Sequence, residues 1–407
     1  DSSISRTIRF VYEGNSRSSV YMASYTPNYA GMYLVMVLPV LFVLALQAKK
    51  IGYKILWTCL IGILLVCLYG TGSKAGFLVC GFLAVLVIIL MAQKHHTKKK
   101  WIYVGICILA AAGITAGYDQ FSGHALSDAL QQIVQKETYD LEEIKAESDG
   151  VCLKYRGNFL KLIPEENEMG QTLTAQINKK EKQTAFWDGE SQSFIFNDKS
   201  FGSLKFDTYR EKGTQYLIIY DGDMTWNFYK EDGAARYVFV NQYGKLDEIQ
   251  NAAAVFKGHE RSLSGRGYIW GRTIPLLKKF LLWGSGPDTF TVKFPQTDYV
   301  MKVNTGLNMY QQLPTKAHSM YLQSALQTGI LSGICLLMFF LHYIRIAVRN
   351  AKTEKNREKA MFRTGILLSV IGFLLMGLAN DSNLAVSPLF WCILGMGIAM
   401  ETETFHS

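Results

Sequence analysis

Charged side chains and proline are both scarce in this chain. Only 18% of its 407 residues are charged, and it has 8 prolines, whereas a typical soluble domain carries about 25% charged residues. Hydrophobic residues make up 49% of the chain. This composition excludes a disordered chain, because such chains are poor in apolar residues, and it argues against a purely soluble enzyme.

Cysteine spacing and the common catalytic signatures are also missing. Of seven cysteines, only Cys152 lies in the polar middle of the chain, so no disulfide framework can form within that part. No zinc-ligand spacing, H-E-x-x-H or G-x-S-x-G is present, and Gly284-Ser285-Gly286 lacks the Lys-Ser/Thr of a nucleotide-binding loop. The sequence therefore predicts neither a metal site nor a cofactor.

Charge of the two signs is unevenly distributed. The net charge is +9, but residues 119–260 hold 16 Lys and Arg against 24 Asp and Glu, a net of −8, which leaves +17 for the remainder. Most of the positive charge lies in short loops between apolar runs and not on one exposed face. This placement argues against a nucleic-acid partner and indicates an acidic block inserted in a basic, apolar frame.

The apolar runs predict membrane-spanning helices. A helix needs about 20 apolar residues to cross a ~30 Å hydrocarbon layer, and the runs here are apolar on all sides. About seven spans are predicted, at residues 30–47, 53–69, 75–92, 101–118, 320–344, 364–379 and 384–400. The lipid bilayer is therefore one predicted partner.

Loop charges predict the orientation of these spans. The connections that begin near Lys49, at residues 93–100 and at residues 345–363 are rich in Lys and Arg, which is typical of cytoplasmic loops. By alternation, residues 119–319 are extracytoplasmic and the protein lies in the cytoplasmic membrane. Residue 1 is Asp and residues 1–29 also fall outside, so we expect further spans upstream and a longer protein of which this chain is a piece.

The predicted fold class is an α-helical polytopic membrane protein with an inserted extracytoplasmic β-sandwich-like domain. In chain order, the predicted parts are an exterior N-terminal segment (1–29), four spans (30–118), an exterior linker helix (119–149), an exterior β-rich domain (150–260), an exterior catalytic loop with an interfacial helix (261–319), three spans (320–400) and a cytoplasmic tail (401–407).

The β-rich prediction rests on short alternating segments separated by Asp-Gly turns, at Asp188-Gly189, Asp221-Gly222 and Asp232-Gly233. Seven or eight strands are expected. Two features have two interpretations. Asp221-Gly222-Asp223 is either a metal-binding D-x-D or a hairpin turn, and its place between strands favours the turn. The aromatic residues either form a sugar-stacking face or fill the core, and alternation favours the core; they are Trp187, Phe194, Tyr220, Trp226, Tyr229 and Tyr237.

The loop after the β-rich segment contains an amphipathic stretch from Ile269 to Trp283. Its basic residues, Arg272 among them, alternate with apolar ones at helical spacing, which predicts a helix in the outer membrane interface. Pro275 is expected to kink this helix or to lie near its start. A polar loop then leads to His318 at the mouth of the fifth predicted span.

Motifs in this loop resemble the O-antigen ligase/polymerase family. Their elements in chain order are Gly265-Arg266, Trp270, Gly284, Gly286, Phe290, Ala317-His318, Tyr321-Leu322 and Thr328-Gly329-Ile330 with Gly333. Upstream, Arg17 with Pro27-Asn28, and Gly72-Ser73-Lys74-Ala75-Gly76, resemble further family elements. Lys74 stands where the family pattern has arginine. The resemblance covers about residues 1–118 and 262–400 and leaves out the β-rich segment.

The resemblance implies a membrane glycosyltransferase without metal or nucleotide cofactor. Such enzymes transfer a glycan from a polyprenyl-diphosphate carrier to a hydroxyl of a glycan or lipid acceptor on the outer face of the membrane. On this basis Arg266 is predicted to bind the diphosphate bidentately. His318 is predicted to act as the general base or to orient the acceptor, and both residues are expected to act on one donor–acceptor complex. The further substrate-binding candidates are Lys74, Arg17, Arg272, Trp270 and Tyr321.

Two other function classes remain open from the sequence. A membrane sensor with an exterior glycan-binding module would need a cytoplasmic output domain, and a glycolipid transporter would need ionisable residues at mid-membrane depth. The chain shows neither feature clearly, which favours the enzyme. Polymerase and ligase use the same donor chemistry, and polymerase is the preferred prediction.

Overall fold

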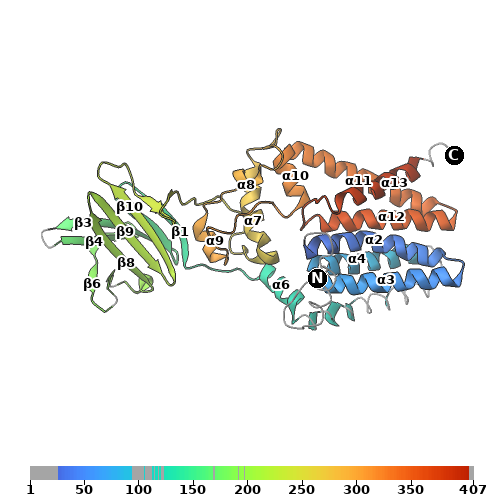
Figure 1. Ribbon diagram of the computed structural model, residues 1–407, viewed down its shortest axis with the longest axis horizontal. Helices are drawn as coiled ribbons and strands as arrows, with labels where there is room; N and C mark the ends of the chain where they lie inside the picture. Colours follow the sequence, from blue (N-terminus) through green and yellow to red (C-terminus); the bar gives the residue numbers. More distant parts are fainter. Residues whose placement is uncertain are drawn as a thin grey trace, which may run out of the picture. The chain divides into compact units, whose positions relative to one another are not determined.

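The computed structural model describes residues 26–93, 105, 112–113, 115–117, 119–120, 123–167, 170–190, 192–196 and 198–402. The chain forms two compact units. The first, here the helical unit, comprises Asp1–Gln131, Lys279–Pro287 and Lys316–Ser407; the second, the sandwich unit, comprises Gln132–Lys278 and Asp288–Thr315. Figure 1 shows the helices of the first unit and the strands of the second.

The helical unit is built from long apolar helices. Helix α2 begins after Thr26, whose hydroxyl accepts a hydrogen bond from the Tyr29 amide, and Pro27 occupies its first turn. Helix α2 contacts α3, α4 and α12, and α12 contacts α11 and α13. The helices are α2 (Pro27–Gln47), α3 (Ile51–Thr71), α4 (Lys74–Gln93), α10 (Met320–Thr328), α11 (Ile330–Thr353), α12 (Arg357–Met376) and α13 (Ser387–Thr402).

Within the described residues, four helices are long and apolar enough to cross a membrane, namely α2, α3, α11 and α12. The apolar helices Lys74–Val87 and Ser387–Thr402 are shorter by the same measure. The chain is thus a membrane protein with a sheet domain, while the count of seven spans stays a prediction. The fourth predicted span, 101–118, lies largely outside the described residues.

The fifth predicted span, 320–344, starts where α10 starts, but it is wrong in its continuity and in its end. Helix α10 ends at Thr328, and a new helix, α11, runs from Ile330 to Thr353. Gly329 lies between them with φ 99° and ψ 152°, a conformation open mainly to glycine. The apolar run is therefore continuous in sequence but broken in the backbone.

Helices α2 and α12 run antiparallel. The Gln47 side-chain amide donates to the Glu358 carbonyl at 2.6 Å, so the end of α2 lies beside the start of α12. At the opposite end, the Met320 amide donates to the Gly377 and Asn380 carbonyls at 2.8 and 2.9 Å. The connections after α2 and before α12 thus share one end of the bundle, as the loop charges predict, and which side of the membrane each end faces stays a prediction.

The described part of the sandwich unit contains two antiparallel sheets, of five strands in the order β1-β2-β3-β4-β5 and of seven in the order β12-β11-β10-β9-β8-β7-β6. The strands are β1 (Leu141–Ala146), β2 (Val151–Tyr155), β3 (Asn158–Asn167), β4 (Gly170–Ile177), β5 (Lys182–Thr184), β6 (Phe186–Asp188), β7 (Ser193–Ile195), β8 (Leu204–Glu211), β9 (Thr214–Asp221), β10 (Met224–Glu231), β11 (Val238–Val240) and β12 (Leu246–Asp247).

The linker helix predicted over residues 119–149 is wrong in its second half. Helix α6 spans only Ala125–Val134, and strand β1 follows at Leu141. Leu141 and Ile144 are both buried, and β1 pairs with β2. Helix-favouring composition is a weak preference, and burial of these side chains in the sandwich core outweighs it. The sheet domain accordingly begins near residue 141 and not at 150.

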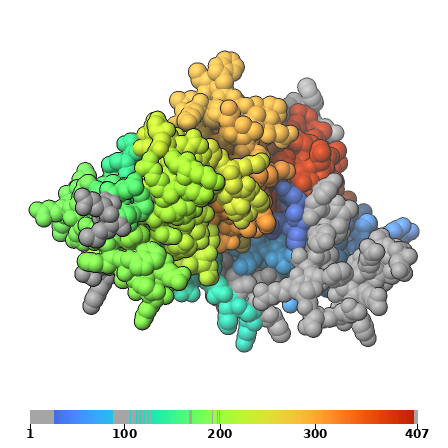
Figure 2. All heavy atoms as spheres, turned by 60° about the vertical axis from the view of Figure 1, so that its left-hand side comes forward, coloured from blue at the N-terminus to red at the C-terminus, as the bar shows by residue number. Residues whose placement is uncertain are grey.

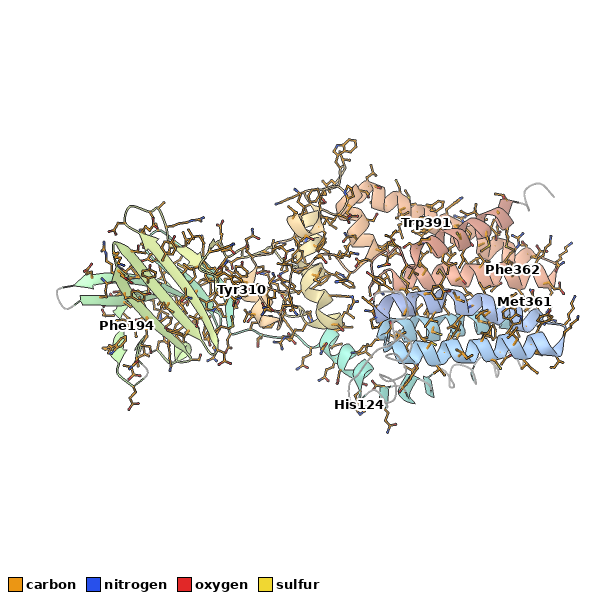
Figure 3. All side chains as sticks on the ribbon, viewed as in Figure 1. His124, Phe194, Tyr310, Met361, Phe362 and Trp391 are labelled. Carbon is orange, nitrogen blue, oxygen red and sulfur yellow. The ribbon has the colours of Figure 1, made fainter. Side chains whose placement is uncertain are left out.

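The sandwich core holds three of the six aromatic residues, so the prediction that alternation places them in the core is wrong for Trp187, Tyr220 and Tyr229. Trp187 is 55% exposed. Trp226 is fully buried, Phe194 and Tyr237 are buried, and Figure 3 labels Phe194 among the sandwich strands. Tyr220 and Tyr229, by contrast, alternate onto the outer face of their sheet. Figure 2 shows the strands of the sandwich unit, coloured green, from the side on which they face the viewer. Asp221 pairs with Met224, so Gly222 and Asp223 form the two-residue turn of a hairpin.

Three further helices complete the sandwich unit: α7 (Ser262–Leu277), α8 (Phe290–Lys293) and α9 (Tyr299–Asn304). Tyr299 and Val300 of α9 join the sandwich core, and Tyr310, labelled in Figure 3, lies 5.4 Å from the Tyr299 ring. The predicted interfacial helix, 269–283, is wrong in its extent. It ends at Leu277, because the carbonyls of Phe280 and Leu281 accept hydrogen bonds from the first amides of α11.

Candidate functional site

His318 and Asp381 form an isolated acid–imidazole pair at one end of the helical unit. His318 Nδ1 lies 3.2 Å from Asp381 Oδ2. The Asp381 side chain is 2% exposed, whereas that of His318 is 44% exposed, so the imidazole is open to a reactant and the carboxylate is not. Both side-chain oxygens of Asp381 are buried without a hydrogen-bond partner among the described residues, so the carboxylate lies within reach of Nδ1 but is not hydrogen-bonded to it.

The backbone around His318 is held in an unusual conformation. His318 has φ 50°, in the left-handed region that β-carbon-bearing residues rarely adopt. Ser319 then caps α10, its hydroxyl accepting from the Leu322 amide, and the Met320 amide contacts the carbonyls of residues 377 and 380. Strain of this kind costs about 1–3 kcal/mol and is typical of functional sites.

The Gly72–Gly76 motif lies at the same end of the bundle. The Ser73 hydroxyl donates to Asn28 Oδ1 at 3.2 Å, which brings the two upstream motifs together. A β-carbon on Gly31 would lie 2.9 Å from Ser73, so glycine is needed for this close approach. Lys74 follows as the first residue of α4 and is half-buried.

The glycines near residue 284 join two distant segments. The Ser285 and Gly286 amides donate to the carbonyls of Leu326 and Gln327 at 2.8 and 3.1 Å. A β-carbon on Gly284 would lie 2.0 Å from the Gln327 oxygen. The motif glycines therefore allow residues 284–286 to pack against the end of α10. His318 lies just before the start of the same helix.

Arg266 lies in the sandwich unit, directly after a run of left-handed backbone. Leu263, Ser264 and Gly265 have φ values of 54°, 60° and 83°. The Arg266 guanidinium donates to the Leu263 carbonyl at 3.1 Å, and its side chain is half-buried. Leu263 and Ser264 carry a β-carbon, so this conformation is costly for them but not for Gly265. Strain of this kind is typical of functional sites.

Arg272 does not lie on an exposed polar face, so this part of the interfacial-helix prediction is wrong. It is 4% exposed. Its Nε donates to Asp298 at 2.8 Å, its NH1 lies 3.3 Å from Glu260, and its guanidinium stacks over Tyr268. Two buried carboxylates compensate its charge, which leaves it poorly placed to bind an added anion.

Lys302 lies beside this buried cluster. Its side chain is fully buried, its ammonium contacts the Met309 carbonyl at 3.4 Å, and burial lowers its pKa to about 8. Burial also raises the pKa of Asp298, although Arg272 opposes that shift. The charged groups of this cluster are almost completely buried, as is typical of a network that stabilises the fold.

The predicted site residues divide between the two units. Lys74, His318 and Tyr321 lie in the helical unit, and Arg266, Trp270 and Arg272 lie in the sandwich unit. The Tyr321 hydroxyl donates to the Leu374 carbonyl at 2.9 Å, so it holds α10 to α12. Arg17 lies outside the described residues. The joint action of Arg266 and His318 stays a prediction.

Sequence reasoning missed Asp381, Glu260 and Asp298. Asp381 was visible as an acidic residue in a short loop between two apolar runs, but nothing in the sequence pairs it with a residue 63 positions upstream. Glu260 and Asp298 carry no local signal. Among the described residues, no group of three or more His, Cys, Asp or Glu could hold a metal ion.

Comparison with known families agrees with the motifs. Residues 233–337 match the family model described as O-antigen ligase. This segment is therefore similar to the O-antigen ligase domain. The matched segment includes Arg266, the 284–286 glycines and His318, and it begins inside the segment that the motifs left out. Comparison with curated proteins and with solved structures gives no match.

The family predicted from the motifs is thereby confirmed for this segment. Residues of the O-antigen ligase domain come from both units, since strands β11 and β12 and helices α7 to α10 all fall within 233–337. The family match supports a membrane enzyme of glycan ligation or polymerisation that acts on lipid-linked donors and acceptors.

Proposed function

We propose that this protein transfers a glycan from a polyprenyl-diphosphate carrier to an acceptor hydroxyl on the outer face of the cytoplasmic membrane. The observation that carries the proposal is the half-exposed His318 backed by the buried carboxylate of Asp381, inside a segment that matches O-antigen ligases. The product is a cell-surface polysaccharide, and polymerisation is the preferred form of the reaction.

In this reaction His318 serves as the general base. The acceptor oxygen forms a bond to the anomeric carbon, the bond from that carbon to the diphosphate breaks, and the acceptor proton passes to the imidazole. Asp381 is the carboxylate that faces the imidazolium in this proposal, since its Oδ2 lies 3.2 Å from Nδ1. General-base catalysis of this kind contributes about 10²–10⁴-fold in rate.

Arg266 and Lys74 bind the departing diphosphate in this proposal. Negative charge grows on the diphosphate as it departs, and a guanidinium matches its oxygens bidentately. Arg266 is preferred over Arg272, because the latter is already neutralised by Glu260 and Asp298. Lys74 offers a point charge without the fork geometry. Trp270, Arg17 and Tyr321 are retained as weaker substrate-binding candidates.

The test is transfer from purified lipid-linked donor by the full chain in detergent. His318→Ala is expected to lose about 10²–10⁴-fold in rate, and Asp381→Asn to lose part of it. The double variant should be no slower than His318→Ala, since Asp381 acts only through the imidazole. Arg266→Ala should lose most activity and Arg266→Lys recover part of it.

A ladder of products indicates polymerase, and a single addition indicates ligase. Assays with and without EDTA test the metal independence predicted from the sequence. Size-exclusion chromatography confirms that each variant is folded. Near wild-type rates for both His318→Ala and Arg266→Ala would contradict the proposed roles.

A further inference from the structure

Three tyrosines form a row across the outer face of the seven-stranded sheet. Tyr216 of β9 pairs directly with Tyr209 of β8 and with Tyr229 of β10. All three alternate with the core-facing residues of their strands, so their side chains point away from the core. Neighbouring strands lie about 4.8 Å apart, which gives one ring per strand.

Ring stacking holds this row in place. The Tyr209 and Tyr216 rings are stacked with centroids 4.7 Å apart and planes 14° apart, and Tyr229 lies 6.2 Å from Tyr216. Tyr209 is 41% exposed. Rings fixed in this way lose little side-chain entropy when a ligand binds, and they present a polar hydroxyl beside an apolar edge.

Polar groups fill the adjoining rows of the same face. Asp207 and Asn227 flank Ile218 in the next row, and Lys205 and Thr225 flank Tyr220 in the row after it. The face therefore alternates aromatic surface with short hydrogen-bonding side chains. On the other side of the tyrosine row, Glu211 and Glu231 flank Thr214. The charged side chains of this face are thus Lys205 against Asp207, Glu211 and Glu231, an excess of carboxylates.

The outer face of the five-stranded sheet is built differently. Its lysines are paired with carboxylates, at 2.7 Å for Lys161 with Asp149 and 3.1 Å for Lys182 with Glu165. Its exposed aromatic side chain is Phe159, with Lys154 over the ring. One face is thus covered by ion pairs, as an ordinary solvated surface would be, and the other carries the tyrosine row.

We propose that the tyrosine face, defined by Tyr209, Tyr216, Tyr220 and Tyr229 with Asp207 and Asn227, binds a linear polysaccharide. Sugar rings offer apolar C–H faces and many hydroxyls, and this face offers aromatic surface, phenol hydroxyls, a carboxylate and an amide in reach of each other. The excess of carboxylates on this face repels phosphate groups, so it fits a ligand of hydroxyl groups better than an anionic lipid surface or nucleic acid.

The sheet that carries the face continues into the O-antigen ligase domain. Strands β11 and β12 belong to the same sheet as β8–β10, and they fall within residues 233–337. The inference deepens the proposed function and rests on it for the identity of the ligand as the glycan acceptor or growing product. The tyrosine face holds that chain and takes no part in bond making.

The experiment measures binding of the full chain in detergent to an immobilised panel of linear hexasaccharides, comprising neutral, N-acetylated and uronic-acid-containing chains, without lipid-linked donor. We expect the wild type to bind at least one of them. The triple variant Tyr209→Phe/Tyr216→Phe/Tyr229→Phe keeps the ring stack and should bind about tenfold more weakly, since each hydroxyl lost removes one hydrogen bond. Tyr209→Ala should also weaken binding. The matched control Phe159→Ala, on the opposite face, should leave it unchanged.

Equal binding by wild type and triple variant would overturn the inference, as would a wild type that binds none of the panel or that uses this face to form dimers. Glycan transfer is measured on the same preparations. A wild type that transfers glycan but does not bind the panel contradicts the tyrosine face alone, whereas one that binds the panel but transfers nothing contradicts the proposed function.

Discussion

At the scale of single residues, two arginines six positions apart on α7 have opposite environments. Arg272 is neutralised by Glu260 and Asp298 and is 4% exposed. Arg266 is half-buried, and it donates to a backbone carbonyl. A cation that already has two carboxylate partners gains little from a phosphate, so the burial pattern separates the structural arginine from the candidate binding one.

Lys302 yields a pH-dependent prediction. Its folded-state pKa, about 8, lies below the ordinary 10.5, so the unfolded chain binds the proton more tightly. The full cost of burying the charge is therefore felt below pH 8 and is relieved as the pH rises to 10.5. We expect Lys302→Met to be more stable than wild type by up to about 3 kcal/mol at pH 7, with the gap closing by pH 10.5.

Chemical unfolding of the full chain in detergent at a series of pH values measures this gap. Lys245→Met, at an exposed lysine of the same unit, is the matched control and should show no such pH dependence. A constant difference between Lys302→Met and wild type across the pH range would contradict the prediction.

At the scale of elements, the break between α10 and α11 organises the functional end of the helical unit. Gly329 ends α10, and the first amides of α11 bond to the carbonyls of Phe280 and Leu281. These amides would otherwise lack partners at a helix start. The break therefore interrupts the span, and the backbone hydrogen bonds on either side of it hold residues 280–286 beside α10.

Two motif glycines should respond differently to alanine. A β-carbon at Gly284 would meet the Gln327 oxygen at 2.0 Å, whereas one at Gly333 would meet Ala325 at 3.4 Å, an ordinary contact. Gly284→Ala should destabilise the protein by roughly 1–3 kcal/mol or more, and Gly333→Ala should be tolerated, since alanine favours a helix. The yield of monodisperse protein on size-exclusion chromatography measures the effect of each variant. Equal yields of the two variants would contradict the close approach of Gly284 to Gln327.

The sandwich needs elements outside its predicted limits. Ile144 of β1 and Val300 of α9 are fully or almost fully buried in its core, yet both lie outside the predicted residues 150–260. We expect a fragment of residues 132–315 to unfold cooperatively, and a fragment of residues 150–250 to be less stable or unfolded. Circular dichroism on heating measures this. A cooperative transition of equal midpoint in the shorter fragment would show that β1 and α9 are dispensable.

At the scale of the whole molecule, the antiparallel bundle requires that Lys355 and the His318 loop lie at opposite ends of the spans. With the positive loops inside, Lys355→Cys should resist a membrane-impermeant maleimide in intact cells, and Lys212→Cys, at a fully solvated site on the sandwich, should react with it. Permeabilised cells provide the control, in which both should react. Labelling of residue 355 from outside would reverse the orientation.

The sequence by itself determined the membrane class, the β-rich insertion and the family. Each depends on a signal that is local and repeated. Long apolar runs can be buried only in lipid or in a large core. Alternating apolar and polar residues bury one face only in a sheet. The order of the motifs around Arg266 and His318 identifies the family from the sequence alone. The hairpin at Asp221–Met224 was predictable for the same reason, because a two-residue Asp-Gly turn is a local signal.

Only the tertiary structure decided the contacts between distant residues. The helix-favouring composition of this segment did not predict β1, whose apolar side chains are buried in the sandwich core. Amphipathic spacing predicted an exposed face for Arg272, because its partners Glu260 and Asp298 carry no local signal in the sequence. The 62 residues between His318 and Asp381 hold two long helices, and only their antiparallel packing brings the carboxylate to the imidazole. Burial and pairing are properties of the folded chain, so no local pattern could report them.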